Sequence, residues 1–245
     1  MNSKNLFSVR NFRLAVFFAL ALAGSNAGMA AEKFNELSAA EKKAGWILLF
    51  DGKTMSGWHG FQITKPAQGW KIEDNSLHHL AKQHKGDLIS DAIFEGFELQ
   101  WEWKVAPSAN SGLKYFVSEE RTAPLGHEYQ MIDDDHYTKP LRGTAQGTGA
   151  LYDLLPPGKN LQIRPVGEFN KSRILVRGLH VEHWLNGQKI VAYELGGEIL
   201  KSAIARSKFK GVKGFGDKIK GHILLQDHGD EVWFRNLKLR PLAGE

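Results

Sequence analysis

The sequence predicts an all-β protein, a sandwich or jelly roll of antiparallel strands. Short segments in which apolar and polar residues alternate recur about ten times in about 215 residues, a spacing typical of these folds. The 26 glycines and an aromatic content of 11% also favour strands joined by tight turns. Helical and strand-like segments do not alternate along the chain, so a parallel sheet is not expected.

The first elements follow from alternation and turn signals. Residues 35–43 form a polar segment that suits a short helix, and a strand is predicted at 46–50 (WILLF), before an Asp-Gly-Lys turn. Residues 70–73 and 76–80 flank an Asp-Asn pair, which predicts a hairpin. Residues 97–105 (FELQWEWKV) alternate so regularly that their two tryptophans are assigned to the core.

The second half of the chain continues this pattern. The Asn-Gly pair at 186–187 suits the type I′ turn of a hairpin. Residues 196–220 are the exception, with a short helix predicted at 199–205 and a Lys/Gly-rich loop long enough to cover part of a sheet. Residues 207–210 either close over a substrate or form a solvated basic loop. Further strands are predicted at 113–117, 127–132, 173–177, 180–185, 189–193, 222–226 and 232–239.

The first thirty residues have the order of an export signal. Three cations precede the apolar run 14–23, and Gly28-Met29-Ala30 supplies the small residues that a signal peptidase reads, so cleavage is predicted before Ala31. Ten apolar residues are too few for a membrane anchor. The predicted organisation is a signal peptide at 1–30, a polar segment at 31–44 and one β-sandwich domain at 45–243.

Composition excludes several classes of function. The chain has no cysteine, which excludes disulfides, zinc–thiolate sites, cysteine nucleophiles and a bacterial lipoprotein anchor. Loss of the three cations of the signal lowers the formal charge from +5 to +2. A nearly neutral mature chain argues against nucleic acids and acidic membranes as partners. We therefore expect a soluble periplasmic or secreted protein with no stable membrane anchor.

Short motifs run in order along nearly the whole mature chain: LFDGK at 49–53, GW at 57–58, NSG at 110–112, YQMID at 129–133, GALYD at 149–153, PP at 156–157, WLNG at 184–187, LQDHG at 225–229 and FRN at 234–236. Together they resemble the 3-keto-disaccharide hydrolase family. The resemblance implies a concanavalin A-like jelly roll of two antiparallel sheets with a carbohydrate groove. It also implies action on glycosides whose C3 hydroxyl is already a ketone, downstream of a separate sugar 3-dehydrogenase.

The implied chemistry needs few groups. A ketone at C3 acidifies the proton on C2, so a base can remove this proton and form an enediolate. The substituent on C1 can then leave by elimination, and water can add back to the product. This route requires a base, a cation or donor for the enediolate oxygen, and an acid for the leaving group. Strand periodicity places Glu128 and Gln130 on one face of 127–132, and Glu128 is the predicted base. The competing reading is a glutamate that faces solvent.

Gln130 argues against an ordinary glycosidase. Conventional glycoside hydrolysis uses two carboxylates, and related enzymes of this fold carry them at near-alternate positions of one strand. Here the position two residues after Glu128 holds an amide, which can be neither nucleophile nor acid. Glu98 and Glu102 alternate on another strand and could supply a partner, although the polar residues between them suggest a solvated face.

The other candidates each have a structural alternative. His228 is a candidate acid or base because imidazole titrates near neutral pH, and His136 is a third catalytic candidate. Asp133 and His136 could hold a divalent metal ion, the one cofactor considered; the alternative is a solvated acidic turn. Lys114 would suit an enolate oxygen. The residues predicted to bind substrate are Asn110, Lys114, Gln130, Tyr152, Gln226 and Arg235.

Three classes of function remain open at this stage. The first is an enzyme that cleaves 3-keto-glycosides by elimination or hydrolysis. The second is a non-catalytic carbohydrate-binding module, because lectins share the implied fold. The third is a conventional endo-glucanase. A binding module needs a groove and aromatic residues, but it does not need Glu128 with a neighbouring imidazole or metal ion.

The export signal can be checked directly. We expect the protein from its native host to have the intact mass of a chain that begins near Ala31, because the order of charges, apolar run and small residues directs cleavage there. Retention of Met1 in the mature product would contradict this prediction.

Overall fold

The computed structural model describes Met1 and residues 33–242. The predicted signal peptide at 1–30 lies outside the described residues, Met1 apart, so its removal stays a prediction. In the described part, neither helix has the length and apolar character needed to cross a bilayer.

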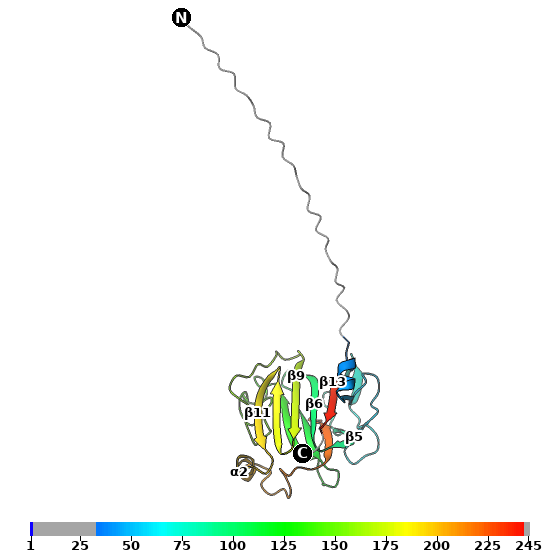
Figure 1. The fold of residues 1–245 in the computed structure, drawn as a ribbon, viewed down its shortest axis with the longest axis vertical. Helices are drawn as coiled ribbons and strands as arrows, with labels where there is room; N and C mark the ends of the chain where they lie inside the picture. Colours follow the sequence, from blue (N-terminus) through cyan, green and yellow to red (C-terminus); the bar gives the residue numbers. More distant parts are fainter. Residues whose placement is uncertain (2–32, 243–245) are drawn as a thin grey trace. The chain divides into compact units, whose positions relative to one another are not determined.

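Two antiparallel sheets make up the fold, as predicted. The larger has eight strands in the order β11-β10-β9-β6-β13-β4-β3, with β1 paired to β13; the smaller has the order β2-β5-β12-β7-β8. Figure 1 shows β11, β9, β6 and β13 across the larger sheet. The strands are β1 (Ile47–Leu48), β2 (Trp58–Gly60), β3 (Trp70–Glu73), β4 (Ser76–His79), β5 (Leu88–Phe94), β6 (Phe97–Val105), β7 (Asn110–Val117), β8 (His127–Ile132), β9 (Asn170–Arg177), β10 (His180–Leu185), β11 (Gln188–Glu194), β12 (Gly221–Leu225) and β13 (Val232–Pro241).

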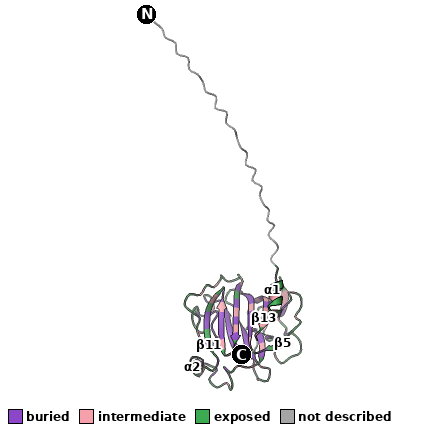
Figure 2. Ribbon diagram, in the orientation of Figure 1, coloured by how far each residue is buried: buried purple, intermediate pink, exposed green. Residues whose placement is uncertain are grey.

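The core lies between the two sheets and follows the alternation of the strands. Figure 2 shows buried residues concentrated along the strands and exposed residues in the loops. Trp101 and Trp103 of β6, which were assigned to the core, are each 1% exposed, and Phe97 and Leu99 on the same face are 0% exposed. On the opposite face, Glu98 pairs with Arg173 and Arg240, and Glu102 pairs with Arg235 and Lys171. The sequence alternation of 97–105 thus separates the core from a charged outer face.

Two hairpin turns have the predicted geometry. Asn186 and Gly187 have φ angles of 48° and 85°, and Asp74 and Asn75 have 48° and 58°. Positive φ at both central residues is the mark of a type I′ turn, whose twist matches the flanking strands. The pairs β10–β11 and β3–β4 are therefore hairpins set by their turn residues.

Both helices lie where they were predicted, but they begin or end at different residues. Helix α2 (Glu198–Arg206) extends the predicted 199–205 by one residue at each end. Helix α1 (Ala39–Lys43) starts later than residue 35, because Ser38 and Glu41 form a capping box that fixes its first turn. Asn35 instead exchanges hydrogen bonds with Asn236 of β13, so it fastens the segment before the helix to the larger sheet.

Two strands were not predicted, and one is shorter than expected. Strand β2 has three residues, too few for a recognisable alternation. Strand β5 reads LISDAIF, and the polar pair Ser90-Asp91 interrupts its apolar run. The strand predicted at 46–50 pairs only over Ile47–Leu48. Tertiary pairing, of β2 with β5, of β5 with β12 and of β1 with β13, defines these elements rather than local pattern.

The smaller sheet places β12, β7 and β8 side by side. Strand β7 lies between β12 and β8, and the pairing of β12 with β7 shifts register between His222 and Leu224. Phe116, with a φ of 58°, forms the resulting bulge, so that Tyr115 and Phe116 are both buried. On the Asn110 side of this bulge, alternate residues of β7 and β8 face away from the core.

Candidate active site

A pocket lies on the outer face of β7, β8 and β12. Seven of the ten predicted site residues line it. Its small volume, about 100 Å³, is below the roughly 300–1,000 Å³ of pockets that enclose a drug-sized ligand, so it suits a single sugar ring. The lining residues are Asn110, Lys114, Pro124, Leu125, Gly126, Glu128, Gln130, Tyr152, Lys208, Phe209, Gln226 and His228.

Glu128 lies at the bottom of this pocket. The residue is 7% exposed, and the alternation of β8 sends His127 and Tyr129 into the core on the other side. Burial raises the pKa of Glu128, because the charged carboxylate loses its hydration; Lys114 and Lys208 partly oppose the rise. A carboxyl group with a raised pKa is a stronger base when ionised, as general-base chemistry near neutral pH requires.

Gly112 makes room for this carboxylate. It lies on β7, next to the strand that carries Glu128. A Cβ atom added at Gly112 would come within 2.5 Å of Glu128 Oε1 and 3.0 Å of its Cδ. The Glu128 side chain therefore crosses β7 over a residue without a side chain, and the glycine of the Asn-Ser-Gly motif has a steric reason.

Gln130 holds the Glu128 carboxylate from the side. With its amide nitrogen turned towards Glu128, it donates to Glu128 Oε1 at 3.1 Å and to the Ser111 carbonyl at 3.2 Å, and this orientation satisfies the amide better than the reverse. In this orientation the amide oxygen faces the side chain of Asn110 at 3.1 Å. The amide that stands where a second carboxylate is usual thus orients the first one.

Lys114 faces Glu128 across the strand pair. The two residues are register partners, and Lys114 Nζ lies 4.0 Å from Glu128 Oε2. Lys114 is 9% exposed, and among the described residues its ammonium makes one hydrogen bond, to the Pro124 carbonyl at 3.4 Å. A buried ammonium with three donors thus has unused hydrogen-bonding capacity beside the pocket.

Asp87 is a pocket neighbour that sequence reasoning missed. It precedes β5, is 8% exposed, and accepts a hydrogen bond from the Asp227 amide at 2.7 Å. Burial raises the pKa of Asp87, and the positive charge of Lys114 opposes this rise. Lys114 therefore lies within the field of two carboxyl groups, Asp87 and Glu128. Because β5 itself was not recognised, no signal placed Asp87 near the site.

Tyr152 and the segment after α2 form the opposite wall. The Tyr152 amide donates to the Glu128 carbonyl at 3.0 Å, which ties this wall to β8. Lys208 Nζ lies 4.3 Å from the centre of the Tyr152 ring, a cation–π contact. The Lys208 amide donates to Asp153 at 3.0 Å, and the Phe209 ring stacks on Phe215 at 4.2 Å. Lys208 and Phe209 therefore line this wall of the pocket, and closure of residues 207–210 over a substrate stays a prediction.

Gln226 and His228 complete the pocket after β12. Gln226 Oε1 is buried and has no hydrogen-bond partner among the described residues, so an acceptor is available for a ligand hydroxyl. His228 is exposed at the pocket, with Nδ1 3.9 Å from Asp230 Oδ2. The same carboxylate oxygen accepts the Asn110 amide at 2.9 Å, which links this turn to β7.

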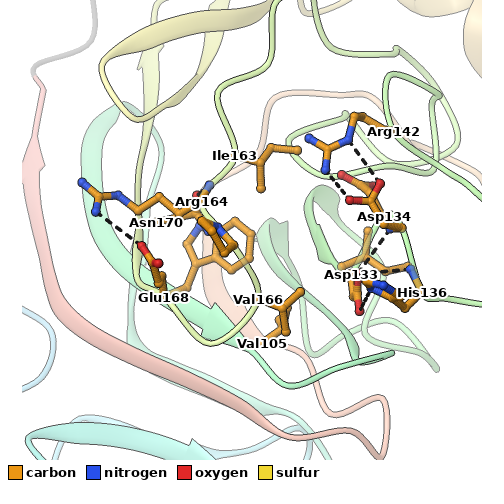
Figure 3. Close-up of a pocket in the computed structure, with 14 residues that line it drawn as sticks. Val105, Asp133, Asp134, His136, Arg142, Ile163, Arg164, Val166, Glu168 and Asn170 are labelled. Atoms are coloured by element: carbon orange, nitrogen blue, oxygen red, sulfur yellow. Dashed lines mark hydrogen bonds and ion pairs between the residues drawn. The ribbon is translucent and has the colours of Figure 1, made fainter.

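Asp133 and His136 lie in a different pocket, shown in Figure 3. Asp133 accepts hydrogen bonds from the amides of Ser108, Asp135 and His136, and His136 Nδ1 lies 3.1 Å from it. Although burial raises it, these hydrogen bonds hold the pKa of Asp133 below its usual value. Within residues 33–242, no group of three or more His, Asp or Glu is arranged to hold a metal ion. The divalent ion stays a prediction.

Arg235 lies on the larger sheet. Its Nε donates to Glu102 Oε2 at 2.8 Å, and its guanidinium stacks on the rings of Phe34 and Phe169. Arg235 thus forms a structural salt bridge outside the Glu128 pocket, although it was predicted to bind substrate. The FRN motif thus contributes to the packing of β13.

Known proteins resemble the chain over most of its length. The profile of the 3-keto-alpha-glucoside-1,2-lyase-like domain matches residues 45–240. The 3-keto-disaccharide hydrolase of Bacteroides thetaiotaomicron is 32% identical over 229 residues, 81% of this chain and 79% of the relative. A candidate glycosyl hydrolase from Parabacteroides distasonis, known from a crystal structure, is 34% identical with a TM-score of 0.79, over 86% of this chain and 100% of the other. A second one is 27% identical with a TM-score of 0.62, over 80% and 99%.

The two lysines make a testable prediction about Glu128. Each lowers the pKa of this carboxyl group, Lys114 more than Lys208. We expect Lys114→Met to raise the pKa of Glu128 further, and Lys208→Met to raise it less. Carbon-13 NMR titration of the Glu128 carboxyl measures both shifts. The exposed Lys139, changed to Met, is the matched control and should leave the pKa unchanged. A fall in the Lys114→Met protein would contradict the assigned electrostatics.

Proposed function

The chain belongs to the family of 3-keto-alpha-glucoside-1,2-lyase-like domains, and from this we propose that it cleaves glycosides whose C3 hydroxyl has been oxidised to a ketone. The family and the curated relative support a carbohydrate hydrolase in general terms. The 3-keto substrate class and the route through elimination are the finer part of the proposal. Such a substrate must come from an oxidoreductase that acts on C3 of a sugar.

One observation carries this proposal: Glu128 is the sole carboxylate among the described residues that line the pocket. Ordinary glycosidases need a second carboxyl group as acid or nucleophile, because they must activate C1 directly. A 3-keto sugar needs one base, since the ketone supplies the electron sink. A buried carboxyl with a raised pKa and a buried ammonium 4.0 Å away fit a base and an electrophile.

The reaction can be written with these side chains. Glu128 takes the proton from C2, and the electron pair moves onto the C3 oxygen to give the enediolate. The ammonium of Lys114 stabilises the negative oxygen. The C3 carbonyl then forms again, a C1–C2 double bond forms, and the C1–oxygen bond breaks. His228 donates a proton to the departing oxygen. Addition of water across C1–C2 completes a net hydrolysis, and release before this addition leaves the elimination product.

The walls of the pocket give the remaining groups their roles. Asn110 and Gln226 offer polar atoms to sugar hydroxyls, and Tyr152 offers a ring face on which a sugar can pack. With substrate bound, residues 207–209 close over the pocket and limit the access of water to Glu128. Because the pocket is small, the oxidised ring enters it and the leaving group points to the exposed His228.

A comparison of substrates tests the proposal. We expect the purified protein to convert 3-keto-trehalose and to leave trehalose unchanged, because only the ketone acidifies C2. Chromatographic analysis of the products measures both reactions. Comparable release of reducing ends from trehalose or an ordinary β-glucan would indicate a conventional glycosidase. Binding of both sugars without turnover of either would indicate a carbohydrate-binding module.

The variant Glu128→Gln is the control for the same reaction. It keeps the shape of the side chain and removes its basicity, so turnover should fall by roughly 10²–10⁴-fold while affinity falls much less. His228→Ala should matter less for substrates with a good leaving group, such as a nitrophenolate. A folded Glu128→Gln protein with near-native turnover would mean that another residue is the base.

The role of Gly112 gives a second prediction. A methyl group there would displace the Glu128 carboxylate, so Gly112→Ala should lower kcat by on the order of 10–100-fold. The methyl group meets a side chain that can rotate, so the melting temperature should change little. The control is Gly211→Ala, because nothing lies within 4 Å of a Cβ atom at Gly211. Steady-state kinetics with a 3-keto-glycoside measure the effect. Equal kcat in both variants would show that this carboxylate position is not critical.

A further inference from the structure

His79 and Asp227 form a buried ion pair behind the pocket. His79 belongs to β4 of the larger sheet, and Asp227 follows β12 of the smaller one. His79 Nε2 lies 3.1 Å from Asp227 Oδ1, and the two side chains are 0% and 3% exposed. The edge of the Trp70 ring packs against the imidazole, with the ring centres 4.8 Å apart. The pair thus connects the two sheets beside the turn that carries His228.

The surroundings assign a positive charge to His79. Its Nδ1 lies 2.9 Å from the Asp230 carbonyl oxygen, which can only accept, so Nδ1 carries a proton. Its Nε2 is buried and lies 3.1 Å from Asp227 Oδ1 without a well-aligned hydrogen bond, and the nearby negative charge favours a proton there as well. Although burial lowers it, the contact with Asp227 raises the pKa of His79. For Asp227, burial raises the pKa of the carboxyl group. The contact with His79 and the hydrogen bonds from nearby amides outweigh burial, and the pKa of Asp227 falls to about 2.

Asp227 organises two chain segments at once. Its Oδ2 accepts the amides of Lys85 and Gly86 at 2.8 and 2.9 Å, and its Oδ1 accepts the amide of Gly229 at 2.8 Å. Its own amide donates to Asp87 at 2.7 Å. Segments 82–87 and 226–230 are therefore held together by this carboxylate, along with the hydrogen bond from the Lys82 amide to the Gly229 carbonyl at 2.6 Å. Uncompensated burial would destabilise this carboxylate, and the imidazolium provides the compensating charge.

Both segments lead to the pocket. Asp87, at the end of segment 82–87, interacts electrostatically with Lys114 of the pocket. In segment 226–230, the pocket residues Gln226 and His228 flank Asp227. Asp230, whose carbonyl binds His79, accepts the Asn110 amide with its carboxylate. We propose that His79, paired with Asp227, is a positioning residue that holds this corner of the pocket without touching the substrate. The expected effect of His79 on kcat rests on the proposed function. Its expected effect on the rigidity of segments 82–87 and 226–230 rests on the structure alone.

His78 provides a matched control. It is the neighbour of His79 on β4, its side chain is 4% exposed, and it lies 2.8 and 2.9 Å from Glu73 and Glu231. Its ring stacks on Trp233, away from the pocket. His78→Gln and His79→Gln therefore each remove an imidazole paired with carboxylate. Only the second change affects the corner that holds Asp227.

Two measurements test the inference. Hydrogen exchange, followed by mass spectrometry, should become about tenfold faster in segments 82–87 and 226–230 of His79→Gln, and it should stay unchanged there in His78→Gln. With a 3-keto-glycoside, kcat of His79→Gln should fall by on the order of 10–100-fold, with a smaller change in KM, as expected for a loss of positioning.

The pH profile separates positioning from a general loss of stability. The His79 charge is present below its raised pKa and is lost as the pH rises through that value, so the wild-type corner should loosen on the alkaline side. His79→Gln should lack this transition. Asp87 interacts electrostatically with both members of the pair, Asp230 contacts His79 with its carbonyl oxygen, and the His84 ring lies against Gly229; His84→Gln should retain the transition.

Defined results would overturn the inference. A folded His79→Gln protein with wild-type exchange and kcat would do so, and so would equal effects in His78→Gln. If His79→Gln does not fold, Asp227→Asn, which keeps the shape and removes the charge, must show the same changes. Exchange needs no substrate, so this comparison decides the positioning role even if the wild-type protein does not convert 3-keto-glycosides.

Discussion

The burial of the Glu128 carboxylate is the constraint to which the rest of the site responds. A carboxylate loses hydration when it is enclosed, and it can be ionised there only if nearby groups return part of that stabilisation. Gly112 leaves the space, Gln130 donates a hydrogen bond, and Lys114 provides the opposite charge from the next strand. These groups do not fully compensate for the lost hydration, so the pKa of Glu128 remains raised. The raised pKa makes this group a better base than an exposed glutamate.

The core side of the same strand obeys the opposite rule. His127 is fully enclosed, and burial lowers its pKa to about 3, so it is neutral. Its Nδ1 lies 2.6 Å from the Tyr193 hydroxyl, which is 2.7 Å from the Tyr115 hydroxyl, and that lies 2.9 Å from His183 Nε2. His183 Nδ1 faces a carbonyl, so each link of this chain has a fixed donor. Strand β8 therefore rests on a neutral, hydrogen-bonded support and presents its charged group to the pocket alone.

Sequence periodicity predicted which face a residue occupies better than which sheet it joins. Glu128 and Gln130 share the pocket face of β8, as the period of two requires, and the alternation of β6 correctly placed two tryptophans in the core. Arg235 was predicted to bind substrate, but β13 belongs to the larger sheet, where Arg235 pairs with Glu102. Asp87 and His79 escaped prediction for a related reason. Each reaches the site through contacts between elements distant in the chain, and no local pattern records them.

A single carboxylate is sufficient for the proposed chemistry because of where charge develops. Direct hydrolysis places positive charge at C1, so a second carboxylate is needed against it. Loss of the C2 proton places negative charge on the C3 oxygen, and a second carboxylate beside it would oppose the reaction. A cation is required instead, and Lys114 supplies one from the cross-strand position opposite Glu128. The replacement of a carboxylate by Gln130 and the burial of an ammonium therefore serve the same end. Both favour the negative charge that develops on the C3 oxygen when Glu128 removes the proton from C2.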